Sequence, residues 1–168
     1  LEANKIGTEG TVTCPDVGGG TNWMSPSFNP TTGLFYVTMR EVCARFYAFP
    51  QEFLPGHLYW GGAVENIPGE PGFGALRAID PVSGLVRWEF KYPKPSFGGT
   101  LSTASGLVFA GEEDGNVMAF DAASGKNLWR LQTGAGLRAG PMSFMHNGKQ
   151  YVVVASGASR VGTWPRPK

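Results

Sequence analysis

The chain has 168 residues and a formal net charge of +1, and only 16% of its residues are charged. Its Lys and Arg residues are scattered and form no basic stripe, which argues against a nucleic-acid partner, and no apolar run reaches the roughly 18 to 20 residues needed to cross a bilayer. A content of 25 Gly, 13 Pro and 12% aromatic residues, without a convincing helix pattern, is typical of many short strands joined by tight turns.

The first notable residues along the chain are its two cysteines, Cys14 and Cys43. Their number permits one disulfide, but the spacing alone leaves two buried thiols or a metal pair equally open. No CxxC motif is present, and His57 and His146 are not spaced as metal ligands beside the cysteines.

Between the cysteines lies the segment GGGTNW, residues 18–23, followed by a hairpin at 25–38 with its turn at NPTTG. The insertion 40–73 is aromatic and Pro-rich, lacks periodicity and points to no function. The elements expected after it are an outer strand pair at 75–92, a hairpin at 100–111, a second outer pair at 116–132 and a hairpin at 142–155.

The two outer pairs repeat each other 41 residues apart, with the shared pattern A-x-D-x-x-S-G-x-x-x-W. The matched residues are Ala78 and Ala119, Asp80 and Asp121, Ser83-Gly84 and Ser124-Gly125, and Trp88 and Trp129. The Asp is expected to start a turn by accepting backbone N–H groups, and the Gly to supply a positive φ. The Trp can wedge between neighbouring sheets.

A period near 40 with four strands per unit indicates a β-propeller. We therefore predict an all-β fold, namely one partial propeller domain over 1–168 with about two and a half four-stranded blades. Because a ring needs about four to eight blades, this is an incomplete ring and a section of something larger; a small sandwich built from the same hairpins is the alternative. The expected blades are 23–92 with the insertion 40–73, then 98–133, and a half blade at 140–160.

The docking repeat, the box Gly-Gly-x-Asn-Trp with NPTTGLFYV, and FGGTLSTASGLVFAG together resemble the C-terminal portion of the quinoprotein alcohol and methanol dehydrogenases. These enzymes are eight-bladed propellers that depend on pyrroloquinoline quinone (PQQ). The resemblance covers nearly the whole chain. It implies that this chain is the C-terminal part of an alcohol-oxidising dehydrogenase that transfers hydride to PQQ, and that it is inactive by itself.

The resemblance also implies a cofactor-binding set of Asn22, Trp23, Phe97 and Gly98. The Asn of the box lies at the central channel of the family and hydrogen-bonds the quinone, although Asn22 could instead cap the loop entering the blade. Trp23 is either a cofactor contact or part of the core. Many members have Trp where this chain has Phe97, so a contact of the Phe97 side chain with the cofactor is in doubt. A contact through the backbone at Phe97 or Gly98 would not depend on this change.

Members of the family have a disulfide bracketing the same hairpin, which implies a Cys14–Cys43 bridge and a periplasmic location. The family's catalytic Asp and its Ca²⁺ or lanthanide ligands precede the matched region, so no catalytic or metal-ligating residue is carried over here. The acidic turn Glu112–Asp114 could bind a cation, but a solvated turn is the simpler reading. The implied partners are the rest of the propeller or other copies of the chain, a small alcohol, and an electron acceptor such as a cytochrome c.

Two other functions fit the repeat. Non-enzymatic propellers, such as outer-membrane assembly scaffolds, carry the same docking pattern and bind proteins. Copies of a short chain could also assemble into a closed ring. The Gly-Gly-x-Asn-Trp box distinguishes the dehydrogenase reading, because a scaffold has no need of it.

Overall fold

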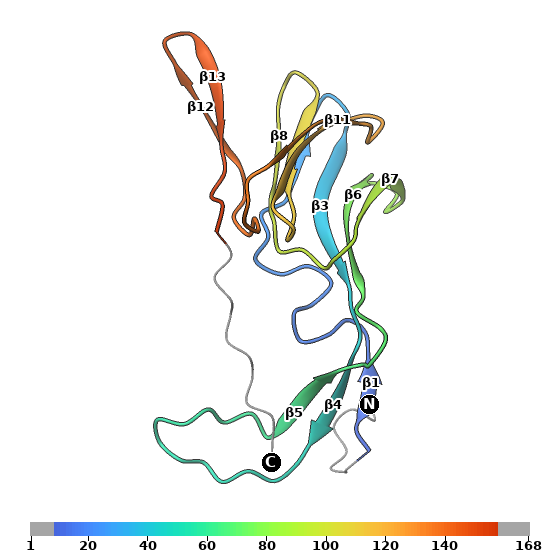
Figure 1. The fold of residues 1–168 in the computed structure, drawn as a ribbon. Helices are drawn as coiled ribbons and strands as arrows, with labels where there is room; N and C mark the ends of the chain where they lie inside the picture. The colour runs from blue at the N-terminus through green and yellow to red at the C-terminus, as the bar shows by residue number, and fades with distance from the viewer. Residues whose placement is uncertain (1–8, 158–168) are drawn as a thin grey trace.

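The computed structural model describes residues 9–157, and within them it is all β, with thirteen strands in four sheets (Figure 1). No helix occurs in this range, so none there is long and apolar enough to span a membrane. The sheets are antiparallel. The two four-stranded sheets and a final hairpin follow one another along the chain, as expected of successive propeller blades, whereas the three-stranded sheet shares its stretch of the chain with the first four-stranded sheet.

The first blade is a four-stranded sheet in the order β2-β3-β6-β7. Its strands are β2 (Ser27–Asn29), β3 (Leu34–Glu41), β6 (Phe73–Ile79) and β7 (Val86–Tyr92). The inner hairpin turns where the Asn29 carboxamide oxygen accepts the N–H of Thr31 at 2.9 Å and Gly33 takes φ +67°. The chain leaves this sheet after β3 and returns at β6, which is where the sequence placed the insertion.

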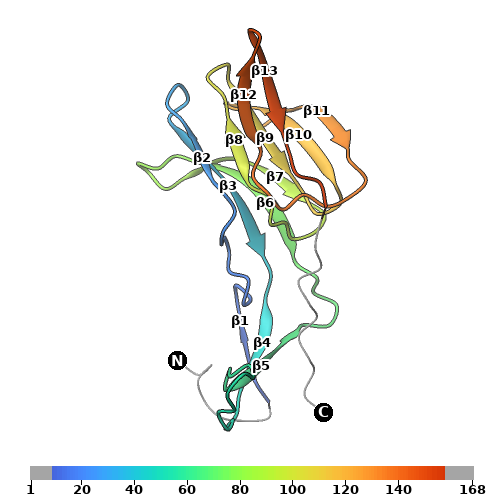
Figure 2. The same cartoon turned by 90° about the vertical axis from the view of Figure 1, so that its left-hand side faces the viewer.

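The second blade is a four-stranded sheet in the order β11-β10-β9-β8. Its strands are β8 (Thr100–Ser102), β9 (Leu107–Gly111), β10 (Asn116–Asp121) and β11 (Asn127–Gln132). A separate hairpin follows, formed by β12 (Met142–His146) and β13 (Lys149–Val153). In Figure 2 this hairpin stands beside the second blade. The expected propeller section of about two and a half blades is confirmed.

The repeated outer turns are built as their sequence predicts. The Asp80 carboxylate accepts the N–H of Val82 at 2.9 Å, and Gly84 closes the turn with φ +73°. The equivalent Asp121 accepts the N–H of Ser124 at 2.8 Å, and Gly125 has φ +71°. The sheet register also shifts at the same place in each repeat, directly after Ala78 and directly after Ala119.

The core lies between the two blades, because both sheets contribute its buried residues, among them Tyr36, Leu76, Val108 and Phe120. Trp88 crosses from the first blade, and its indole N–H donates to the Ala122 carbonyl at 3.0 Å. The Tyr36 hydroxyl donates to the same oxygen at 3.0 Å, so two side chains of one blade meet on one carbonyl of the next. Burial is the main cause that raises the pKa of Tyr36, which keeps this donor protonated.

The insertion is more ordered than its sequence suggests. It contains β4 (Ala44–Ala48) and β5 (Gly62–Asn66), which join β1 (Thr11–Thr13) in a small sheet in the order β1-β4-β5. Between β4 and β5 a long loop reaches away from the blades at the lower left of Figure 1.

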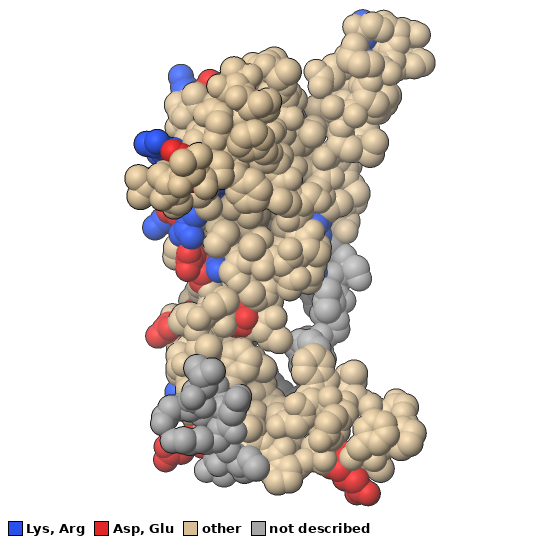
Figure 3. Space-filling view, turned by 180° about the vertical axis from the view of Figure 1, so that it is seen from behind, with Lys and Arg blue, Asp and Glu red and all other residues tan. Residues whose placement is uncertain are grey.

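Charged groups of both signs are intermixed along one edge of the molecule, and much of the face seen in Figure 3 carries no charged group.

Candidate functional site

The segments that lead into the innermost strands of the blades converge at one end of the sheets. The Thr100 N–H donates to the Ser25 carbonyl at 2.8 Å. A Cβ placed on Gly99 would lie 2.7 Å from the Gly140 Cα and 3.1 Å from the Ser25 nitrogen. The chain therefore brings together positions just before β2, β8 and β12. Side chains that precede these positions, those of Trp23, Phe97 and Arg138, lie close together.

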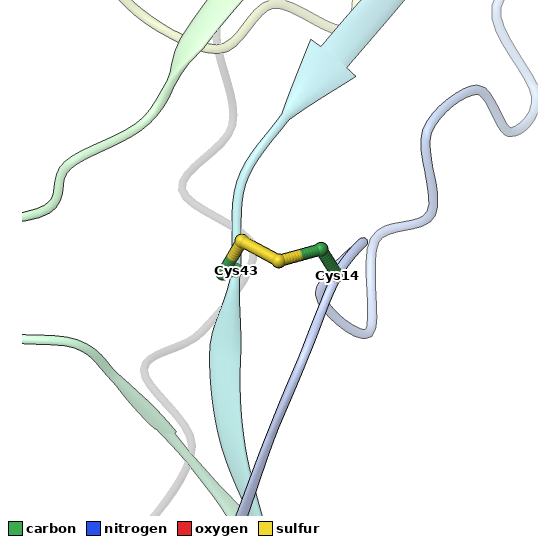
Figure 4. Close-up of a disulfide and its surroundings, with 2 residues drawn as sticks. All are labelled: Cys14 and Cys43. Carbon is green, nitrogen blue, oxygen red and sulfur yellow. A yellow bond between two sulfur atoms is a disulfide. The ribbon is translucent and has the colours of Figure 1, made fainter.

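A disulfide joins Cys14 to Cys43 (Figure 4), which confirms the pairing implied by the resemblance. It links the segment after β1 to the junction between β3 and β4, with the two Cα atoms 4.4 Å apart. Next to it, the Asp16 N–H donates to the Val42 carbonyl at 2.7 Å. The bridge thus anchors the start of the glycine-rich loop to the end of β3.

Two glycines of this loop, Gly18 and Gly19, are required by the protein itself. A Cβ on Gly18 would lie 2.8 Å from the Arg40 Nη2, and Gly19 has φ +73°, a conformation that other residues rarely adopt. At Gly18 the requirement for glycine therefore comes from the Arg40 guanidinium, which is the close neighbour.

Asn22 lies exposed at the end of the loop, and its Nδ2 donates to the Gly18 carbonyl at 3.2 Å. The loop-capping contact is therefore real. Within residues 9–157 the other half of the amide, Oδ1, accepts no hydrogen bond. Capping and ligand binding are compatible here, since the cap uses one amide proton and leaves an acceptor and a second proton available.

Trp23 follows, and its side chain is 59% exposed, so the reading of Trp23 as a core residue is wrong. The indole lies parallel to the Phe97 ring, with centroids 4.7 Å apart and planes 4° from each other. The Arg40 guanidinium carbon lies 4.0 Å from the Phe97 ring centre, and that of Arg138 lies 5.6 Å from it. The two expected cofactor residues Trp23 and Phe97, which are far apart in sequence, thus form one aromatic platform.

Gly98 is buried, and its backbone faces protein. Its N–H donates to the Ser96 hydroxyl at 3.1 Å, and a Cβ there would lie 2.2 Å from the Gly111 carbonyl oxygen. The requirement for glycine therefore comes from close packing on β9. A ligand contact through the Gly98 N–H would have to replace the Ser96 hydroxyl.

Comparison with known proteins identifies the family of this chain. Residues 70–152 match the family model described as the glucose/ethanol/alcohol dehydrogenase β-propeller domain with PQQ. The chain is 41% identical over 140 residues to a quinoprotein ethanol dehydrogenase of Pseudomonas aeruginosa, an alignment that covers 83% of this chain and 22% of the relative. It is 34% identical over 154 residues to a lanthanide-dependent methanol dehydrogenase of Methylorubrum extorquens, covering 90% and 25%.

A solved structure agrees with both matches. The crystal structure of quinohemoprotein alcohol dehydrogenase from Comamonas testosteroni superposes with a TM-score of 0.79 at 33% identity, over 94% of this chain and 25% of that one. The chain belongs to the PQQ-dependent dehydrogenase family of β-propellers. It spans about a quarter of the length of these relatives.

Charged groups of this PQQ-family propeller section line a cavity of about 400 Å³ next to Phe97 and the disulfide. Arg40 pairs with Asp16 at 2.9 Å, and Arg138 pairs with Glu113 at 2.7 Å. The acidic turn is not simply solvated, since Glu112 is buried and accepts the N–H groups of Asp114 and Asn116. Among residues 9–157 no group of three or more His, Cys, Asp or Glu side chains is arranged to hold a metal.

Sequence reasoning missed Arg40 and Asp16, which connect the disulfide, the glycine loop and the aromatic platform. A signal was present in the sequence. Arg40 falls in the strand LFYVTMRE, otherwise mostly apolar, and it is buried like its neighbour two positions earlier, Thr38. A charged residue on the buried face of a strand needs a partner. Its partner, Asp16, lies two residues after Cys14.

Proposed function

We propose that this chain is the C-terminal part of a PQQ-dependent alcohol dehydrogenase and forms one wall of its cofactor channel. The observation that carries the proposal is the exposed Asn22 amide, with its free Oδ1, beside the Trp23–Phe97 platform where the inner segments converge. In the parent protein the successive blades would be 23–92, 98–133 and the half blade 140–160, with the insertion 40–73 on the first; residues 158–160 of the half blade lie outside the described residues.

The residues present fit a planar ligand edged with carbonyl and carboxylate groups. Asn22 would hold such an edge by donating its second amide proton or accepting through Oδ1. Trp23 would offer an exposed aromatic surface against which a flat ring can pack, and Phe97 would keep that surface oriented. The backbone around Phe97 and Gly98 would close the wall. Bound PQQ would supply the two-electron acceptor that receives hydride from the alcohol.

Other parts of the parent protein would complete the reaction. We expect the catalytic base and the ligands of Ca²⁺ or a lanthanide to lie outside these 168 residues, so the chain alone should be inactive. The electron acceptor would be a cytochrome c, in keeping with the quinohemoprotein names of two relatives. The Cys14–Cys43 disulfide supports an oxidising compartment, which we take to be the periplasm.

The test is PQQ binding to the native protein after removal of its cofactor. Asn22→Ala should weaken PQQ binding by about 10- to 100-fold, the value of a hydrogen bond to a charged group. Gln150→Ala is the matched control, because it removes an exposed amide from the β12–β13 hairpin, and among residues 9–157 that amide bonds the Ser143 hydroxyl alone. This control should leave the dissociation constant unchanged.

A native protein that binds no PQQ would overturn the proposal and favour the non-enzymatic scaffold instead. Binding that is equally strong in the Asn22→Ala and unsubstituted proteins would remove Asn22 from the site. It would return that residue to its loop-capping role alone.

A further inference from the structure

Arg40 is a buried charge at the centre of the candidate site. Its side chain is 7% exposed, and its Nη2 donates to both carboxylate oxygens of Asp16, at 3.1 and 2.9 Å. Asp16 is itself 11% exposed. A buried ion pair adds little net stability compared with apolar residues of similar size. Its presence therefore calls for a role beyond holding the fold together.

The pair shapes the loop that carries Asn22. The Asp16 carboxylate also accepts the Gly18 N–H at 2.9 Å, while the Arg40 backbone N–H donates to the Gly20 carbonyl at 2.7 Å. Gly18 packs directly on the guanidinium, where a Cβ would not fit. The Gly18 carbonyl in turn accepts the Asn22 amide. The direction of the Asn22 side chain is thus set by a loop wrapped around Arg40.

The same guanidinium orients the aromatic platform. Its carbon lies 4.0 Å from the centre of the Phe97 ring, and that ring lies parallel to Trp23. Phe97 comes from the segment that enters the second blade, whereas Arg40 belongs to β3 of the first. One buried side chain therefore contacts both halves of the site, which come from different blades.

We propose that Arg40 is the positioning residue of the cofactor wall, fixing Asn22 through Asp16 and Gly18 and fixing Trp23 through Phe97. This inference rests on the proposed function, since it assigns a role toward the same ligand. Arginine is essential to it, because a lysine keeps the charge and one nitrogen donor for Asp16 but offers no flat group to lie against the Phe97 ring. The Nε of Arg40 is buried and has no hydrogen-bond partner among residues 9–157, so the ion pair with Asp16 leaves one donor of the guanidinium unused.

The experiment compares Arg40→Lys and Arg40→Met with Arg77→Met in the native protein, using PQQ affinity of the cofactor-free form and thermal unfolding. Arg77 is the matched control because it also bonds carboxylates of its own blade, Glu41 and Glu89 at 2.6 Å each, but contacts none of the residues in the site. Arg40→Lys should unfold near the temperature of the unsubstituted protein and bind PQQ about 10- to 100-fold more weakly. Arg77→Met should lower the unfolding temperature and leave the affinity as it was.

A double substitution separates positioning from a general loss of structure. Because Arg40 acts through Asn22 and through the aromatic platform, Arg40→Lys should weaken binding less in an Asn22→Ala background than in the unsubstituted protein. Equal affinity of Arg40→Lys and the unsubstituted protein would overturn the inference and leave the proposed function standing. Absence of PQQ binding by the unsubstituted protein would overturn both.

Discussion

The contact between the two blades makes a quantitative prediction at Gly125. A Cβ there would lie 2.5 Å from the Trp88 ring, in a residue with φ +71°. Gly84, the equivalent residue one repeat earlier, has φ +73°, and a Cβ placed there would have no atom of residues 9–157 within 4 Å. An alanine at Gly84 therefore costs only the left-handed backbone, about 1 to 2 kcal/mol. An alanine at Gly125 adds about 1 to 3 kcal/mol of overpacking against Trp88.

The assay is denaturant unfolding of Gly84→Ala and Gly125→Ala, each made also in a Trp88→Leu background. We expect Gly125→Ala to destabilise the protein by about 2 to 5 kcal/mol when Trp88 is present, and by the backbone term alone when it is absent. Gly84→Ala should cost the same in both backgrounds. The reasoning would be refuted if the Gly125→Ala and Trp88→Leu effects added to within about 0.5 kcal/mol, since that is how independent sites behave.

Two further predictions concern the turns and the disulfide. The Arg87 guanidinium is the main cause that lowers the pKa of Asp80 from its usual 3.8 to about 2. The ionised Asp80 thus stabilises the folded protein above pH 3.8, and this contribution is lost as the pH falls toward 2. The unfolding temperature of Asp80→Asn should therefore change less with pH over that range than that of the unsubstituted protein. An equal slope in the two proteins would contradict the assignment. Replacing Cys14 and Cys43 together by Ser should lower the free energy of unfolding by about 3 to 4 kcal/mol, because the disulfide closes a loop over a separation of 29 residues. Unfolding with and without reductant measures this difference. An unsubstituted protein whose stability does not change with reductant would contradict the prediction.

The parts of the fold that could be predicted are those encoded by local rules. The docking turns repeat because Asp80 and Asp121 each bond the N–H groups that follow, and Gly84 and Gly125 each supply a positive φ. Such signals lie within a few residues of one another and read the same wherever the turn occurs. The 41-residue register then places the strands on either side of them.

What the sequence did not reveal depends on distant partners. The strands β4 and β5 lack alternation because their burial is partial, and β4 is paired with β1, more than thirty residues earlier. Trp23 was open to a core reading because a lone tryptophan before a strand usually packs inward, and only its stacking on Phe97 shows that it lies on an exposed face. For the same reason the need for glycine at position 18 could not be derived, since it comes from Arg40.

The docking contact also makes the two lateral sides of the propeller section different from each other. Trp88 donates to a turn on the blade after it, whereas the equivalent Trp129 is 48% exposed and the equivalent turn at Gly84 lies open. One lateral side therefore presents an exposed tryptophan, Trp129, and the other presents an open docking turn at Gly84. A neighbouring unit, whether a further blade or a second copy, can be added only head to tail. Such contacts can close into a cyclic ring or run on as a helical filament, but they cannot form a symmetric two-fold pair.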